Sequence, residues 1–224
     1  MKLDTNQIHI IDTVLEKLGV TYIDYKYEIL DHIATEIEEK MIIHNIGFEE
    51  AFPAVLKKWQ PKFKKSSSVL FGFFWKMPEV LLNKCIRMYR KKLLLVLTAA
   101  MVLTSGFLLF SSFLRNHLAD FFGIATILYS MAFLLSAIGY VKIRLSKSKT
   151  SYGFLYKQQF IACSLVASQQ LYYMNSGFES KGFPSLFSYF IIFTLSIYFI
   201  FSVFNLIYYR AHFYELKRMR FLEA

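Results

Sequence analysis

The chain has 224 residues, 55% of them hydrophobic and 18% aromatic, and the apolar residues concentrate after Leu93, which argues against a single soluble domain. The formal net charge of +10 arises after Lys65, because the first 65 residues carry eleven acidic and nine basic side chains. Basic residues beside apolar segments predict membrane topology and contacts with anionic lipid headgroups. Direct nucleic-acid binding is therefore not expected. The two cysteines exclude a disulfide framework.

Residues 1–65 have the pattern of a small cytoplasmic head made of three helices. Between Tyr22 and His44, apolar residues fall on one stripe of a helix and carboxylates on the other side. Apolar residues also recur at helical spacing before Gly19 and after Gly47, and both glycines stand where C-terminal helix caps are expected. A single amphipathic helix needs a partner for its apolar stripe, so we expect the three helices to pack together.

Residues 66–92 are expected to form a linker and an interfacial basic segment between the head and the membrane. The run Lys62–Ser68 predicts a short linker. The stretch Val69–Leu82 is too short to span a bilayer and is interrupted by Gly72 and Pro78. It is rich in Phe and Trp, which settle at the level of the lipid headgroups, so it predicts an interfacial segment.

Four apolar runs predict a four-helix transmembrane bundle over residues 93–209, and therefore an all-α fold for the whole chain. A helix of about twenty apolar residues crosses a bilayer core of ~30 Å. The runs are Leu93–Leu114, Leu118–Val141, Phe154–Met174 and Pro184–Tyr208. The third run is the least apolar because it contains Lys157 and four glutamines.

Basic residues gather in the loops on one side of the predicted spans. They are Lys76, Lys84, Arg87, Arg90, Lys91, Lys92, Lys142, Arg144, Lys147, Lys149, Arg210, Lys217, Arg218 and Arg220. The opposite loops hold Arg115 and Lys181, so the positive-inside rule places both termini in the cytoplasm. We expect a multi-pass protein of the cytoplasmic (inner) membrane with a basic cytoplasmic tail at residues 210–224.

Three motifs in the predicted head suggest a family. They are YKYEILDHI at residues 25–33, IEE at residues 37–39 and IGFEEA at residues 46–51. With these motifs the chain resembles the HAAS domains (helix-turn-helix-associated alpha-helical signalling domains), in which a short helical bundle precedes several transmembrane helices. It is also similar to small membrane proteins of the Bacteroidetes type. The resemblance covers Gly19 to Pro61 and implies a signalling or interaction role, with PadR-type transcription regulators as partners.

The polar side of the central predicted helix is the candidate partner-binding surface. Its residues are Asp24, Glu28, Asp31, His32, Glu38 and Glu39. Glu28, His32 and Glu36 recur at i, i+4 and i+8, a spacing that could present ligands to one metal ion. The zinc-protease pattern HExxH and a second histidine at ligand spacing are absent, which favours a solvated or partner-facing stripe. We expect neither a metal nor a cofactor.

Polar residues inside the predicted spans form a second candidate site. They are Lys157, Gln169, Gln170 and Asn205. Ionisable groups at depth are candidates for function, although Lys157 can extend to the headgroups and the amides can bond neighbouring helices.

No nucleophile elbow, phosphate-binding glycine loop, kinase signature or zinc pattern occurs in the sequence, so we expect a non-enzymatic protein. The leading interpretation is a signalling or interaction adaptor whose head recruits a cytoplasmic or membrane protein partner. The alternative is a transporter component or a structural subunit of a larger membrane protein complex. The sequence leaves oligomer formation open.

Overall fold

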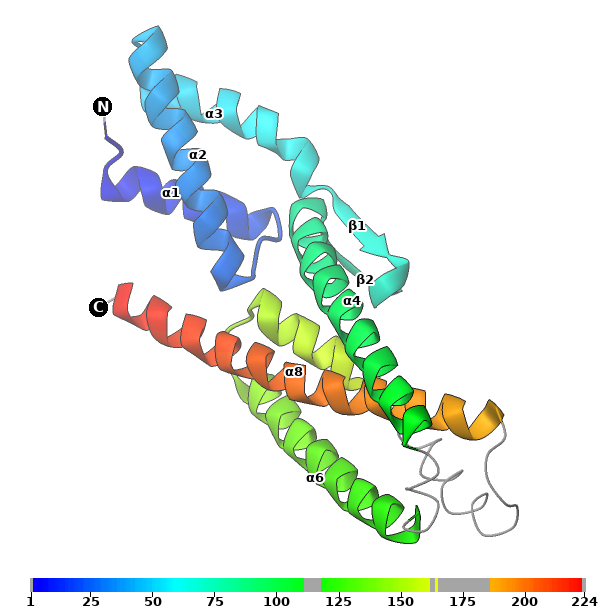
Figure 1. Cartoon of the computed structure of the whole chain (residues 1–224). Helices are drawn as coiled ribbons and strands as arrows, with labels where there is room; N and C mark the ends of the chain where they lie inside the picture. The colour runs from blue at the N-terminus through cyan, green and yellow to red at the C-terminus, as the bar shows by residue number, and fades with distance from the viewer. Residues whose placement is uncertain (1, 111–117, 162–163, 165–185, 223–224) are drawn as a thin grey trace. The chain divides into compact units, whose positions relative to one another are not determined.

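The computed structural model describes residues 2–110, 118–161, 164 and 186–222, and this part of the chain is mostly helical (Figure 1). Its internal contacts define two compact units. The N-terminal unit contains the residues up to Met88, together with Ser148–Ser151 and the end of the chain from Phe213. The second unit contains Tyr89–Lys147 and Tyr152–His212. Each unit is described separately below.

Three helices form the first part of the N-terminal unit, where the sequence predicts them: α1 (Thr5–Lys17), α2 (Ile23–His44) and α3 (Phe48–Trp59). Helix α1 begins with a capping box, because Asp4 accepts a hydrogen bond from the Gln7 backbone N–H at 2.7 Å and the Gln7 side chain accepts one from the Asp4 backbone N–H at 3.0 Å.

The cap expected at Gly19 is confirmed, since this residue follows α1 with a positive φ of 86°. The expectation for Gly47 is wrong. Asn45 ends α2 in the left-handed conformation with a φ of 52°, and Gly47 is instead the N-cap of α3 with a φ of −81°. Asparagine is among the few residues that adopt this conformation readily, so it takes the place of glycine.

The core of the three helices follows their apolar periodicity. Its buried residues include Ile11 and Leu15 of α1, Ile29, Ile33 and Ile37 of α2, and Ala51, Val55 and Trp59 of α3. Because residues four positions apart share one face of a helix, the α2 positions form a continuous buried row. The opposite face of α2 stays exposed.

A short β-hairpin stands where the sequence suggests a linker. After a 3₁₀ turn at Gln60–Phe63, strand β1 (Lys65–Ser68) pairs antiparallel with β2 (Gly72–Pro78), and a second 3₁₀ turn, Val69–Phe71, joins them. The strands add a small sheet to the expected all-α fold. Phe63, Phe71 and Met77 are buried in this region. A flexible linker would leave these apolar side chains in water, whereas here they pack into the unit. The predicted interfacial position of Val69–Leu82 stays a prediction.

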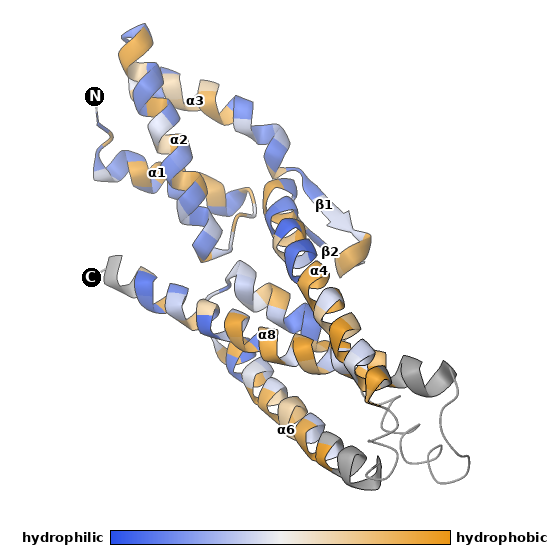
Figure 2. Ribbon diagram, in the orientation of Figure 1, coloured by the Kyte–Doolittle hydropathy of each residue, from blue (hydrophilic) through white to orange (hydrophobic). Residues whose placement is uncertain are grey.

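Long helices make up most of the remaining chain: α4 (Glu79–Leu109), α6 (Leu118–Leu145), a helical segment at residues 151–161, and α8 (Leu186–Leu222). Figure 2 shows apolar residues concentrated along α6, α8 and the C-terminal half of α4.

Among the described residues, two helical stretches are long and apolar enough to cross a membrane, Thr126–Leu145 of α6 and Ile192–Met219 of α8. They overlap the second and fourth predicted spans. Residues 111–114 of the first predicted span, and residues 162–163 and 165–174 of the third, lie outside the described residues.

Within the second unit, α8 packs against both α4 and α6. Val96 and Ala100 of α4 are buried against Ile200 and Phe201 of α8. On the α6 side, the ring centroids of Tyr129 and Tyr198 are 4.2 Å apart.

The helical segment 151–161 packs against α6 at a glycine. The hydroxyl of Tyr156 donates a hydrogen bond to the Ser136 carbonyl oxygen at 2.8 Å and lies directly beside Gly139. The ring of Tyr156 also contacts Tyr209 of α8. Four helical segments thus share contacts inside this unit.

Candidate functional site

The exposed face of α2 carries a stripe of acidic and apolar side chains, which we call the α2 stripe. It consists of Glu28, Asp31, His32, Thr35, Glu39, Ile42 and Ile43, all exposed. At 100° per residue these positions fall within an arc of about 120°. The opposite arc holds the buried row that forms the core, so α2 supports the unit with one side and presents the other to solvent.

Three of the six predicted partner-binding residues make contacts inside the N-terminal unit. Asp24 accepts hydrogen bonds from the backbone N–H of Ser151, at 2.8 Å, and from its hydroxyl. Glu38 accepts one from the Leu3 N–H at 2.9 Å, and Glu28 pairs with Lys84 at 2.5 Å.

The other three predicted residues, Asp31, His32 and Glu39, lie exposed on the α2 stripe. Within the described part of the chain, their side chains form no ion pair or hydrogen bond. These three residues are therefore available to an external partner.

The metal alternative has no geometric support in the residues that the structure describes. Glu28 pairs with Lys84, and Glu36 pairs with Lys58 at 3.0 Å. The described ranges contain no group of three His, Cys, Asp or Glu side chains that could hold a metal ion.

A buried lysine joins α1 to α2. The Nζ of Lys26 lies 2.8 Å from Asp12 and 2.9 Å from Glu16. Burial lowers the pKa of Lys26, but the hydrogen bonds and charges of Asp12 and Glu16 outweigh this effect and raise it overall. The sequence held a signal for this cluster, because Lys26 falls within the apolar stripe of α2 and the two carboxylates lie one turn apart on α1.

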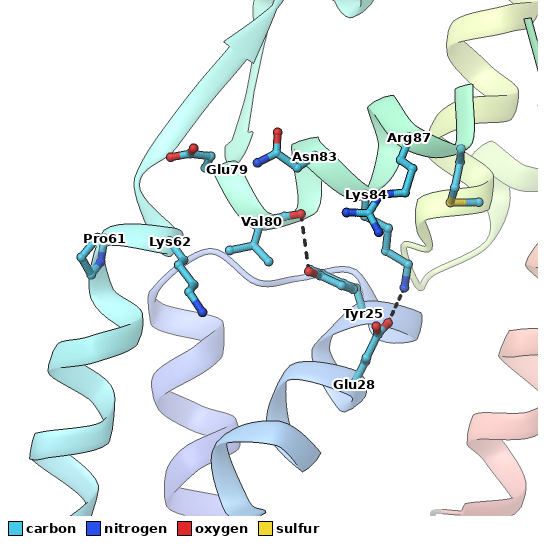
Figure 3. Close-up of a pocket in the computed structure, with 10 residues that line it drawn as sticks. Tyr25, Glu28, Pro61, Lys62, Glu79, Val80, Asn83, Lys84 and Arg87 are labelled. Atoms are coloured by element: carbon cyan, nitrogen blue, oxygen red, sulfur yellow. Dashed lines mark hydrogen bonds and ion pairs between the residues drawn. The ribbon is translucent and has the colours of Figure 1, made fainter. Parts of the chain in front are cut away.

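A cavity of about 750 Å³ lies in the N-terminal unit between α2, the turn after α3 and the start of α4 (Figure 3). Tyr25 lies in its wall, with its hydroxyl donating to the Val80 carbonyl oxygen at 3.4 Å. The Nζ of Lys84 sits 4.4 Å from the centroid of the Tyr25 ring and bonds Glu28. Burial, followed by the negative charge of Glu28, raises the pKa of Tyr25 to about 12, so its hydroxyl keeps its proton at neutral pH.

Cys85 of α4 is also in the N-terminal unit and is fully buried. Burial, with the charge of Asp24 adding to it, raises the pKa of the thiol to about 12. Since the thiolate is the reactive form, this environment disfavours a nucleophilic role for Cys85 and is typical of a packing residue.

A polar cluster lies inside the second unit, around Lys92 of α4. Its Nζ donates hydrogen bonds to Gln159 Oε1 at 2.6 Å and to Asn205 Oδ1 at 3.2 Å. The ring of Tyr208 lies 4.1 Å from the ammonium group. Lys92, Gln159 and Asn205 are between 2% and 8% exposed. We call these three residues the Lys92 cluster.

The Lys92 cluster contains one of the predicted intramembrane polar residues, Asn205. Lys157 lies two positions before Gln159 and is half-buried, whereas Gln169 and Gln170 lie outside the described residues. Sequence reasoning missed Lys92, because it follows Arg90 and Lys91 and reads as a third residue of a basic flank.

No protein-family model, curated protein or solved structure matches the chain. The described part of the chain is that of a mostly helical protein, with two helices long and apolar enough to cross a membrane, an N-terminal unit with an exposed acidic stripe, and a buried polar cluster.

Proposed function

We propose that this protein is a non-enzymatic adaptor of the cytoplasmic membrane, which docks a soluble protein on the α2 stripe. The observation that carries the proposal is that Asp31, His32 and Glu39 lie exposed beside Ile42 and Ile43 on one helix face. Protein interfaces combine an apolar centre with charged groups that steer the partner and set its register. The partner then has a basic surface with an apolar depression.

The HAAS resemblance supports the same proposal, because two of its motifs, at residues 25–33 and 37–39, lie within α2 and the third, at residues 46–51, includes the start of α3. Members of that family work with soluble transcription regulators of the PadR type. A cytoplasmic regulator is accordingly the first class of partner to test.

Apolar side chains that face away from the second unit support a membrane anchor. Only 22% of the tested window of Thr126–Leu145 and 33% of that of Ile192–Met219 is buried, which supports contact with lipid better than a place in the core of a water-soluble domain. Side chains such as Val102 and Leu134 are exposed. A continuous surface of this kind is stable against lipid and costly in water. Four spans with both termini in the cytoplasm satisfy the positive-inside rule.

Charge reversal on the α2 stripe tests the adaptor proposal. We expect Asp31→Lys combined with Glu39→Lys to reduce crosslinking of the partner about tenfold or more, because like charges placed across an interface cost several kcal/mol. The intact chain is crosslinked in native membranes, and each recovered protein is quantified by mass spectrometry. The matched control is Glu49→Lys with Glu50→Lys, which changes the charge equally on exposed carboxylates of α3. Equal recovery of every partner by the stripe variant and the control contradicts the proposal.

The Lys92 cluster favours a second candidate function, a component of a transporter or of a larger membrane complex. The Oε1 of Gln159 faces the ammonium group, which fixes the amide orientation, and its buried Nε2 has no hydrogen-bond partner among the described residues. An acceptor supplied by a substrate or a neighbouring subunit would satisfy this donor.

Substitution of Lys92 tests this candidate. We expect Lys92→Met to leave two buried amide oxygens without their donor, at about 1–3 kcal/mol each, and to disrupt assembly or transport while partner recovery by the α2 stripe persists. Native electrophoresis of solubilised membranes measures assembly, and thermal unfolding measures stability. The control is Lys91→Met, which removes an exposed charge from the adjacent position. Unchanged stability and assembly count against any role for the cluster.

A further inference from the structure

Three cationic side chains line the cavity of the N-terminal unit. Lys62 comes from the turn after α3, and Lys84 and Arg87 come from the first turns of α4 (Figure 3). Lys62, which is 22 and 25 positions away from Lys84 and Arg87 in the sequence, therefore shares one space with them. Like charges repel, so their convergence around an open volume favours a negatively charged occupant.

Arg87 is the most informative of the three. It is exposed, and its side chain forms no hydrogen bond or ion pair with any residue that the structure describes. A guanidinium group presents five donors in a planar fork that fits phosphate or carboxylate oxygens in pairs. Among the described residues, no carboxylate or other acceptor occupies that fork.

Two carboxylates also line the cavity, Glu28 and Glu79. Glu28 is neutralised by its ion pair with Lys84. Lys62 and Arg87 then face the single remaining charge of Glu79, which leaves one net positive charge. The Lys84 ammonium is shared between Glu28 and the face of Tyr25, so it can shift toward a stronger anion.

We propose that this cavity binds a phosphate-bearing anion, supplied by a phospholipid headgroup or by a soluble phosphate ester. Its volume of about 750 Å³ is larger than a bare phosphate needs, so it accommodates a substituted phosphate. Arg87 would engage the phosphate through paired N–H donors, with Lys62 and Lys84 as further cations. Arg87 lies six positions before Leu93, where the apolar run starts, which is about 9 Å along a helix axis and within reach of a headgroup layer.

The test uses the full chain in phosphatidylcholine nanodiscs. One arm adds sn-glycerol 3-phosphate and measures its binding by calorimetry. The other arm replaces part of the lipid by phosphatidylglycerol and counts retained phosphatidylglycerol molecules by native mass spectrometry. We expect Arg87→Gln to weaken binding about tenfold or more in at least one arm, since a charged hydrogen-bond pair is lost. The matched control is Arg90→Gln, which removes the same charge from an exposed position of the same helix.

A second variant gives the opposite sign. Glu28→Gln releases Lys84 from its ion pair and should strengthen binding severalfold, whereas Glu39→Gln, an equal charge change outside the cavity, should leave it unchanged. Binding in the first arm identifies a soluble ester, and binding only in the second identifies a lipid headgroup. The proposal is overturned if neither ligand binds, or if Arg90→Gln weakens binding as much as Arg87→Gln does. The adaptor proposal is unaffected by either result, because it rests on the α2 stripe and a different readout.

Discussion

Ile33→Ala is expected to destabilise the N-terminal unit by about 2–5 kcal/mol, enough to unfold a large fraction of a marginally stable small domain. Ile33 is 0% exposed and lies in the middle of the buried row of α2. Truncation of the Ile33 side chain leaves a cavity in the core of the three helices, and this core is too small to rearrange and fill it. The measurement is denaturant unfolding of the full chain, followed by the fluorescence of buried Trp59 in a Trp75→Phe background that leaves Trp59 as the single tryptophan.

The control for this prediction uses the same residue type on the same helix. Ile42 is 62% exposed, so Ile42→Ala should change the free energy of unfolding by about 0.5 kcal/mol or less. Equal effects of the two substitutions would show that α2 does not bury the face assigned to it. Ile33→Ala should also abolish partner recovery while leaving membrane insertion intact.

Gly139→Ala is expected to destabilise the second unit by about 1–3 kcal/mol, the usual effect of overpacking. A Cβ at this position collides with the hydroxyl of Tyr156 and lies 3.0 Å from its Cζ. Tyr156 is 1% exposed and is held by its hydrogen bond to Ser136, so the ring has no free space into which to move. Thermal unfolding of the detergent-solubilised chain, monitored by size-exclusion chromatography after heating, measures the effect.

Gly106→Ala in α4 should act in the opposite direction. Among the described residues, no atom beyond the backbone of α4 itself and the chain neighbours lies within 4 Å of a Cβ placed there, and alanine favours a helix over glycine by up to about 1 kcal/mol. Both variants add a methyl group to a helical glycine. If Gly139→Ala lowers the stability while Gly106→Ala raises it, the loss is caused by the close packing of residues 151–161 against α6. A loss of stability in both variants would instead indicate that any side chain at a helical glycine is harmful here.

The exposed face of α2, which we propose as a docking surface, could be predicted only in part from the sequence. The periodicity of α2 identified Asp31, His32 and Glu39 on its polar face, and these residues are exposed. Asp24, Glu28 and Glu38 have the same periodicity, but the structure uses them in contacts with Ser151, Lys84 and Leu3. Helical spacing gives the direction of a side chain and carries no information about which other segment meets it.

The β-hairpin could not be predicted from the composition of its sequence. Serine-rich and basic residues before an aromatic run predict a linker by composition, yet Ser66 pairs with Met77 in an antiparallel ladder. Phe63, just before the hairpin, and Phe71, in the turn that joins its strands, are both buried in the unit. Strand formation is set by such tertiary context more than by intrinsic preference.

By itself, the sequence determined the features that depend on neighbouring residues: the three helices of the N-terminal unit, the α1 cap at Gly19, and the apolar runs that form α6 and α8. Helical periodicity, cap chemistry and the length of an apolar run are all local properties. Only the tertiary structure decided that Lys92 meets Gln159 and Asn205, which are 67 and 113 positions away, and that Arg87 lines a cavity together with Lys62 and Lys84. These contacts depend on how separate helices pack, and a buried charge finds its partner through that packing alone.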